Sequence, residues 1–287
     1  MPIEIRKLDD FSIELKASGY PLALINLIRR YALAKVPCMA VDEVVVLENS
    51  SVLFDEILAH RLGLIPLYSE IALRKYGEVP PEVCAKCSST ESEERPPEDV
   101  CKKCFAYLTL KAEARDREVV VYSGDIVPLD DDVRPVFKNI PIVILAPRQK
   151  IELELRARLG RGLEHAKWSP ATVAVSRYVV DVVIDEYSCT GCGVCATLCP
   201  KGVITMKDSR PVVVDSENCI ACKQCVANCP SKAIDIVPRQ DEYVLYIEST
   251  GALKPETIVR EAINILIGEL EDISKKVAKW KDEVLKR

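Results

Sequence analysis

The pattern of hydrophobic and polar positions marks five segments of the chain as β-strands. Strict alternation, which places apolar side chains on one face of a strand, runs through residues 11–15 and 151–159. Short apolar runs at residues 44–47, 178–184 and 243–247 predict three further strands. The last two runs lie on either side of a cysteine-rich segment, so we expect the chain to leave a sheet, form a separate unit and return.

Helical spacing of apolar residues predicts two helices in the first quarter of the chain. Pro21 begins the first helix and Pro37 ends it, because proline fits the first turn of a helix but cannot continue one. A short second helix is predicted at residues 52–61. The apolar face of the first helix carries Leu24, Leu27, Ile28 and Tyr31.

A third predicted helix, near the end of the chain, has the most regular pattern. Its apolar residues are separated alternately by four and three positions over four heptads, with Glu and Lys around them. The stripe consists of Val259, Ile263, Leu266, Leu270, Ile273, Val277, Trp280 and Val284. Because heptad regularity is typical of helix pairs, we interpret the stripe as a dimerisation or docking surface. A helix packed on its own domain is the alternative.

The cysteine-rich segment repeats the motif C-x2-C-x2-C-x3-C-P, at residues 189–200 and again thirty positions later. This spacing is typical of two-cluster bacterial ferredoxins, in which the fourth cysteine of each run binds the other cluster. A disulfide framework, which needs an oxidising compartment, or a zinc site fits this pattern less well. The expected ligands of the first [4Fe–4S] cluster are Cys189, Cys192, Cys195 and Cys229, and those of the second are Cys219, Cys222, Cys225 and Cys199.

A second group of cysteines has the spacing of a structural metal site. Two C-x2-C pairs, Cys84 with Cys87 and Cys101 with Cys104, are separated by thirteen residues that are mostly polar. Four thiolates complete a tetrahedron and leave no open position, so we expect structural zinc. Two disulfides or an iron site are the alternatives. The remaining cysteine, Cys38, lies beside apolar residues and is expected to be a small buried side chain.

Composition limits the class of protein to which the chain belongs. The 287 residues include thirteen cysteines, with no apolar run of transmembrane length and no signal-like start, which favours a reducing cytoplasm. A net charge of −5 and a pI near 5.4 argue against direct binding of nucleic acid. Phosphate-binding, dinucleotide-binding and zinc-protease motifs are absent from the sequence, and the two histidines have no obvious catalytic partner.

Three segments outside the cysteines resemble a known family. Residues 26–46, NLIRRYALAKVPCMAVDEVVV, and residues 60–67, HRLGLIPL, resemble the first two sequence blocks of the α-like subunits of cellular RNA polymerases. Residues 162–170, GLEHAKWSP, resemble the HAKW-P segment of the archaeal and eukaryotic branch. These segments, followed by a ferredoxin-like unit and a terminal helix, identify the chain as a member of the D-type subunits of archaeal RNA polymerases.

The resemblance implies an α+β fold with a discontinuous α/β dimerisation domain. Residues 1–45, 165–184 and 240–287 would form that domain, the last segment with the heptad helix. Residues 46–164 would form an inserted, mainly β domain with the zinc site, as in eukaryotic relatives. Residues 185–239 would form a ferredoxin-like insertion. Some members of the family carry one cluster, even a three-iron cluster, or none, whereas the eight ligands here predict two four-iron clusters.

The resemblance also implies a non-catalytic scaffold in DNA-directed RNA polymerase. Such a subunit forms a heterodimer with the L-type subunit and, with the N- and P-type small subunits, supports the two large catalytic subunits. The heptad stripe and the apolar face of the first helix fit this heterodimer. The clusters would be structural or redox-sensing, with no contact to nucleic acid or membrane. A ferredoxin-type electron-transfer protein is the alternative, although no flavin or nicotinamide motif accompanies the cysteines.

Overall fold

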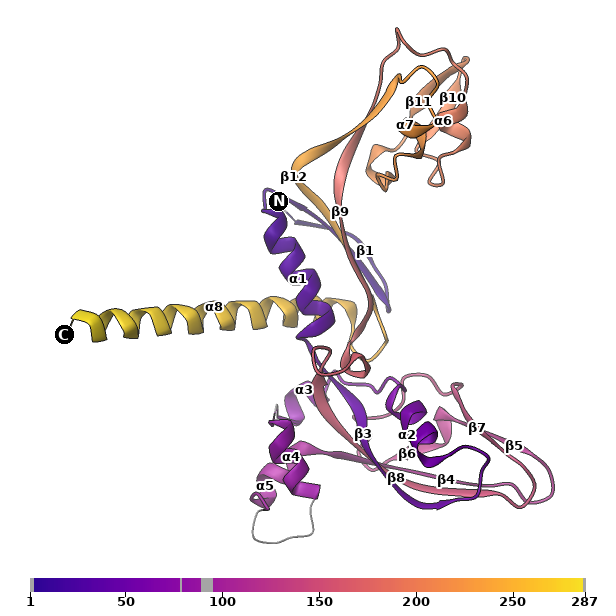
Figure 1. Cartoon of the computed structure of the whole chain (residues 1–287), viewed down its shortest axis with the longest axis vertical. Coiled ribbons are helices and arrows are strands. Elements are labelled where there is room, and N and C mark those ends of the chain that lie inside the picture. The colour runs from indigo at the N-terminus through magenta and orange to yellow at the C-terminus, as the bar shows by residue number, and fades with distance from the viewer. Residues whose placement is uncertain (1–2, 78, 89–94, 286–287) are drawn as a thin grey trace. The chain divides into compact units, whose positions relative to one another are not determined.

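The computed structural model describes residues 3–77, 79–88 and 95–285 (Figure 1). The backbone divides into two compact units, each assembled from segments that are far apart in the sequence. Unit 1 comprises Met1–Lys7, Glu14–Arg29 and Val175–Tyr246, and unit 2 comprises Leu8–Ile13, Arg30–Ala174 and Ile247–Arg287. Helices and strands are mixed in the chain, which confirms the α+β fold class.

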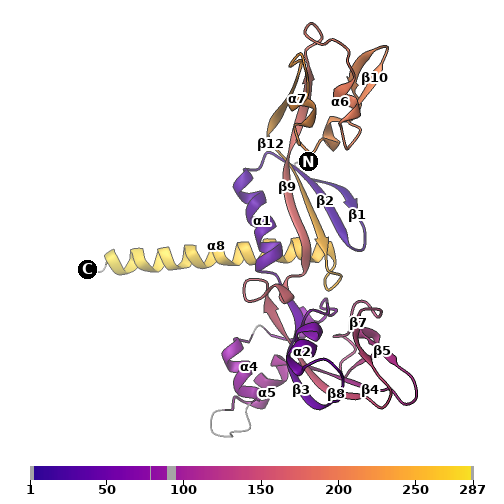
Figure 2. The same ribbon diagram turned by 45° about the vertical axis from the view of Figure 1, so that its right-hand side comes forward.

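The main sheet of unit 1 has the strand order β1-β2-β12-β9. Its strands are β1 (Ile3–Leu8), β2 (Ser12–Ser18), β9 (Ala171–Ile184) and β12 (Ile234–Ser249). Arg239 of β12 holds Asp181 of β9 through both carboxylate oxygens, with its closest contact at 2.7 Å. The two neighbouring strands run side by side in both views (Figure 2). The cysteine-rich unit lies at their ends, where the chain leaves β9 and returns into β12.

The cysteine-rich unit is an insertion between β9 and β12, as expected. It contains α6 (Val194–Thr197), β10 (Ile204–Lys207), β11 (Arg210–Val213), a 3-10 helix η3 (Ser216–Asn218) and α7 (Gln224–Ala227). Strands β10 and β11 form an antiparallel hairpin whose turn residues, Asp208 and Ser209, both have positive φ, as a two-residue hairpin turn requires. Apolar residues from β9, β10 and β12 pack with two of the cysteines.

Unit 2 contains two β-sheets in addition to its helices. One antiparallel sheet has the order β3-β8-β4-β6, and β5 pairs with β7 in a second sheet. The strands are β3 (Pro37–Asn49), β4 (Ala106–Glu113), β5 (Val119–Tyr122), β6 (Ile126–Pro128), β7 (Pro141–Leu145) and β8 (Lys150–Arg161). Two short helices, α2 (Asp55–Gly63) and α3 (Ala72–Lys75), contribute buried residues to the same core.

Strand β8 is the centre of this sheet, and its alternating sequence explains why. Ile151, Leu153 and Leu155 are completely buried against β3 and β4. On the other face, Glu152 pairs with Lys111 at 2.6 Å, and Arg156 pairs with Glu43 at 2.9 Å. The predicted alternation therefore places one row of side chains in the core and one row toward charged neighbours.

The side chains of the long helix α8 (Pro255–Leu285) become more exposed along its length. Its first turns are anchored within unit 2, where Ile258 and Ala262 are buried. Glu269 accepts hydrogen bonds from the Tyr31 hydroxyl at 2.6 Å and from Lys35 at 2.5 Å. From residue 270 to residue 281 every side chain is exposed. The heptad stripe is therefore half-buried at its start and uncovered further on, while the side chain of Val284 lies outside the described part.

The HAKW segment is held in unit 2 by close packing of its tryptophan. Trp168, in a 3-10 helix η2 (Ala166–Trp168), is buried and donates from Nε1 to the carbonyl oxygen of Arg158 at 3.2 Å. The ring lies so close to Gly160 that a Cβ atom there would be 2.5 Å from two ring carbons. Glycine is therefore required at this point of β8 by the approach of the indole.

Two cations cover the same ring and share one carboxylate. The charged groups of Arg158 and Lys167 lie 4.1 Å and 4.2 Å from the ring centroid of Trp168, which is the geometry of cation–π contacts. Asp42 of β3 accepts hydrogen bonds from Arg158 at 2.7 Å and from Lys167 at 2.8 Å. Burial alone would raise the pKa of Asp42, but these two cations lower it. Asp42 thus ties β3, β8 and the HAKW segment together.

We expect Gly160→Ala to reduce the free energy of unfolding of unit 2 by about 2 kcal/mol, because the new methyl group overlaps the Trp168 ring. Urea denaturation followed by tryptophan fluorescence measures the change. Gly268→Ala in α8 is the matched control, since no atom lies within 4 Å of its added Cβ. This control should stabilise the helix by about 0.5–1 kcal/mol. Equal midpoints for the two variants would contradict the close packing.

Candidate metal centres

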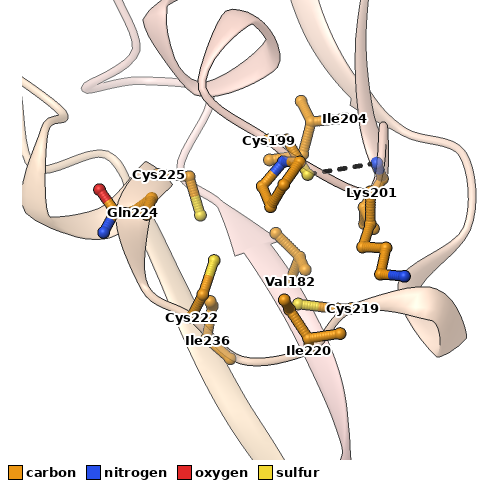
Figure 3. A pocket seen from close by; sticks show the side chains of 12 residues that line it. Val182, Cys199, Lys201, Ile204, Cys219, Ile220, Cys222, Gln224, Cys225 and Ile236 are labelled. Carbon is orange, nitrogen blue, oxygen red and sulfur yellow. Dashed lines mark hydrogen bonds between the residues drawn. The ribbon is translucent and has the colours of Figure 1, made fainter. Parts of the chain in front are cut away.

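Four of the eight ferredoxin-type cysteines line one cavity in the insertion. They are Cys199, Cys219, Cys222 and Cys225, which is the set predicted for the second cluster. Figure 3 shows their sulfur atoms turned toward a common space between the loops. Val182 of β9, Ile204 of β10 and Ile236 of β12 supply apolar walls. The cavity thus combines four soft donors with a largely apolar lining, as an iron–sulfur cluster requires.

The other four cysteines line a second cavity. They are Cys189, Cys192, Cys195 and Cys229, the set predicted for the first cluster. In each cavity, three cysteines come from one run and the fourth comes from the other run. The fold therefore brings together the two interlocked sets and not the two consecutive runs.

The ligand loops depend on backbone conformations that turn the chain sharply. Gly191 and Gly193 have φ values of 68° and 75°, in the left-handed region that glycine adopts without steric cost. A Cβ atom on Gly191 would lie 2.4 Å from the carbonyl oxygen of Ser209. Close approach of the loop to the β10–β11 turn therefore adds a second reason for glycine at this position.

The fourth cysteine of each run accepts backbone hydrogen bonds. The amides of Val203 and Ala233 donate to the sulfur atoms of Cys199 and Cys229, each at 3.3 Å. Burial alone would raise the pKa of both thiols, but hydrogen bonds lower both, from backbone groups and, at Cys229, also from Ser231. The lowered pKa values favour the thiolate form of Cys199 and Cys229, which is the form that binds a metal.

The pKa of the third cysteine of each run is shifted in the opposite direction. Burial raises the pKa of Cys195 and Cys225, and the neighbouring thiols act in the same direction. Cys192 and Cys222, by contrast, are exposed. Since a cluster takes thiolates, binding would release protons from Cys195 and Cys225. In both runs the second cysteine is therefore exposed and the third has a raised pKa, whereas Cys219 and Cys225 are more deeply buried than Cys189 and Cys195.

The two C-x2-C pairs meet in unit 2 on short helices, α4 (Pro81–Ser88) and α5 (Glu98–Cys104). The structure joins Cys84 to Cys104 and Cys87 to Cys101 as disulfides, each with Cα atoms 5.5 Å apart. The sulfur atoms of Cys87 and Cys104 lie 3.9 Å apart. All four sulfurs therefore belong to one cluster, packed against Phe105. Sequence spacing indicated separate tight turns, whereas each pair occupies one turn of helix.

Cys38 is buried in β3, as expected for a small apolar side chain. Its sulfur lies 3.5 Å from the hydroxyl oxygen of Ser69. Burial raises the pKa of Cys38 to about 11. This thiol is therefore protonated at neutral pH and separate from the metal-binding candidates.

Two family models match separate parts of the chain. Residues 44–183 match the family model described as RNA polymerase Rpb3/RpoA insert domain, and residues 188–233 match the model described as 4Fe-4S dicluster domain. DNA-directed RNA polymerase subunit Rpo3 of Aeropyrum pernix is 35% identical, over 98% of this chain and 96% of its own length. Subunit Rpo3 of Methanothermobacter thermautotrophicus is 35% identical, over 95% and 97% respectively.

A further Rpo3 subunit, from Archaeoglobus fulgidus, is 36% identical over 95% of this chain and 96% of its own length. The chain belongs to the Rpo3 family of archaeal DNA-directed RNA polymerase subunits. Membership confirms the resemblance drawn from the three sequence blocks, and the dicluster match supports iron–sulfur cofactors in the insertion. The predicted mainly β insert is also confirmed. Among the described residues, no helix is long and apolar enough to span a membrane.

The predicted interface residues lie on α1 (Leu22–Ala34) and α8. On α1, the four residues are half-buried, and on α8 the exposure of the stripe increases along the helix. Leu270 is 57% exposed and Val277 is 59% exposed. Charged residues that hold the cluster loops, Glu217 and Arg177, were missed, because their partners are distant in the sequence.

We expect Cys199→Ala to remove the second cluster and leave the first, because Cys199 lines the second cavity. Iron should fall from about eight to about four atoms per chain. Alkylation followed by mass spectrometry should then find Cys219, Cys222 and Cys225 newly reactive. Cys229→Ala is the matched control and should expose the first set. Exposure of Cys189, Cys192 and Cys195 in the Cys199→Ala variant would show that each run holds its own cluster.

Proposed function

We propose that this chain is the non-catalytic assembly subunit of a cytoplasmic DNA-directed RNA polymerase. It would pair with the L-type subunit and, with the N- and P-type small subunits, form the platform on which the large catalytic subunits assemble. Similarity to Rpo3 subunits along nearly the whole chain is the observation that carries this proposal. The same full-length match favours this function over that of a ferredoxin-type electron-transfer protein.

The uncovered part of α8 fits a partner helix. Leu270, Ile273, Val277 and Trp280 are all more than half exposed and follow one another at intervals of three, four and three residues. Such spacing places them on one face, where a second helix would bury them by knobs-into-holes packing. Lys276 and Asp272 pair at 2.7 Å beside this face. The partner is therefore expected to offer an apolar helical surface with a polar rim.

The two clusters are proposed to stabilise the insertion. Its apolar cluster is small and contains two of the cysteines themselves, Cys219 and Cys225. Residues 185–239 are near the lower size limit at which a hydrophobic core alone holds a domain together. Eight cysteine–iron bonds would supply the missing cross-links, and loss of the clusters through oxidation would make the insertion sensitive to redox conditions.

The four clustered sulfurs of α4 and α5 are proposed to bind zinc when they are reduced. A tetrahedral four-cysteine site needs thiolates from two pairs, and these helical turns provide them around one point. In a reducing cytoplasm the disulfide form is disfavoured, so that zinc would replace the two bridges. The role of the ion would be to join α4 to α5.

Ile273→Asp should weaken binding of the L-type subunit about 100-fold, because a charge would be buried in the helix–helix contact. Co-expression and affinity purification of the two subunits, followed by titration, measures this effect. Ser274→Asp is the matched control, since it adds the same charge to an exposed neighbouring position outside the stripe. Undiminished binding by the Ile273→Asp variant would rule out the stripe as the contact.

Anaerobically purified chain is expected to contain about one zinc ion in addition to its iron. Cys87→Ser should remove the zinc and leave the iron content unchanged, since the two kinds of site share no residue. Elemental analysis of both forms measures the two metals. A zinc-free native chain in which peptide mapping finds the Cys84–Cys104 and Cys87–Cys101 bridges would contradict the zinc assignment.

A further inference from the structure

The two cluster sites are nearly identical in their internal construction. Residues that differ by thirty in number occupy equivalent positions, so that Val203 and Ala233 make the same hydrogen bond to the fourth cysteine of each run. Asp185 and Asp215 also correspond, and each accepts hydrogen bonds from backbone amides just ahead of the first cysteine. These shared contacts therefore do not distinguish the two sites.

The surroundings of the second site include an ionic contact with the main sheet of unit 1. Glu217 lies in η3, two residues before Cys219, and accepts a hydrogen bond from Lys16 of β2 at 2.6 Å. Its other carboxylate oxygen pairs with Arg6 of β1. Arg177 of β9 donates to the backbone carbonyl oxygens of Glu217 at 3.0 Å and of Cys219 at 3.2 Å. We call the group formed by Glu217, Lys16, Arg6 and Arg177 the Glu217 clamp.

The clamp is continuous with further charged groups of the sheet. Lys16 also lies 3.4 Å from Glu242 of β12, and Arg177 lies 3.9 Å from Glu14 of β2. The side chains of Arg6 and Lys16 are only 14% and 16% exposed. Networks of shielded charges are screened less by salt than isolated surface pairs. The loop that carries Cys219 is therefore fixed to the sheet by three cations on three strands.

The first site has no counterpart to the clamp among the described residues. The position equivalent to Glu217 is Tyr187, whose side chain is fully exposed. An open hollow of about 760 Å³ lies against Cys189 and is lined by Glu186, Lys207 and Arg210 as well as apolar residues. Solvent and small molecules thus reach the first site through an open face, and within the described part of the chain its ligand loop has no charged attachment to the sheet.

Backbone conformation adds a second difference between the sites. The left-handed positions that are Gly191 and Gly193 in the first loop are Ala221 and Lys223 in the second, with φ values of 53° and 58°. A residue with a Cβ atom adopts this region at a cost of about 1–2 kcal/mol. Such conformations persist where the surrounding structure holds them. The second loop therefore depends on external support more than the first loop does.

We propose that the two cluster sites are unequal, and that Glu217 and Arg177 are positioning residues that hold Cys219 in place for the second cluster. The inference rests on the proposed function in that both sites bind clusters. The first cluster leaves first when iron is withdrawn, while the second remains and ties the insertion to the main sheet. Without the Glu217 clamp, the strained second loop would no longer retain its cluster longer than the first loop does.

The order of cluster loss can be measured on the full-length chain under anaerobic conditions. Iron content is determined first, and the chain is then incubated with an iron chelator while samples are alkylated and mapped by mass spectrometry. Cys189, Cys192 and Cys195 should become reactive about five-fold faster than Cys219, Cys222 and Cys225, as expected for one partly shielded ionic network. Raising the salt concentration should narrow this difference.

Glu217→Gln should remove the five-fold difference by accelerating release from the second site alone. Tyr187→Phe, at the equivalent position of the first loop, is the matched control and should leave both rates unchanged. Arg177→Met tests the other half of the clamp and should act like Glu217→Gln. Adding Lys223→Gly to the Glu217→Gln variant should slow the second release again, because glycine relieves the strain. A general loss of stability would accelerate release from the first site as well.

Several outcomes overturn the inference. Eight iron atoms that leave both sites at equal rates in the native chain would show that the sites are equivalent. Unchanged release from the second site in the Glu217→Gln and Arg177→Met variants would show that the clamp does not position the loop. A chain that binds no iron even after anaerobic reconstitution would instead overturn the proposed clusters, and the inference with them.

Discussion

Pairing of β9 with β12 is the interaction on which the insertion and the main sheet of unit 1 both depend. The chain leaves the sheet at the end of β9 and returns at the start of β12, and the ion pair between Asp181 and Arg239 joins the two strands. The same strands provide walls for both cavities, through Val182 and Ile236 in one and through Ile184 and Ile234 in the other. Separation of β9 from β12 would therefore disturb the metal sites and the sheet in one event.

Local patterns in the sequence were sufficient to predict the parts of the fold that local interactions determine. The interlocked cysteine sets followed from spacing, because short loops around a metal restrict where ligands can lie. The alternation of Ile151, Leu153 and Leu155 likewise revealed the strand at the centre of unit 2. Strand ends were less well predicted: β3 begins at Pro37 and continues to Asn49, whereas only its residues 44–47 were recognised.

Interactions between distant segments could not be read from the sequence. Arg6 meets Glu217 across more than two hundred positions, and no spacing rule links a charged residue to a partner so far away. The four sulfurs of α4 and α5 could be grouped, but their helical setting depends on packing with Phe105. Asp42 was equally inconspicuous, although it joins two cations around Trp168. Long-range charge pairing and close aromatic packing are properties of the folded chain alone.

Helix α8 has a consequence for how the amount of this subunit is controlled. Its first turns are secured within unit 2 by Glu269, so the uncovered apolar face beyond it cannot fold back without breaking those contacts. A copy without a partner therefore keeps a row of large apolar side chains in water, where chaperones, proteases and other copies recognise such surfaces. Under the proposed pairing, copies without a partner would be removed, and the supply of the partner would set the number that survive.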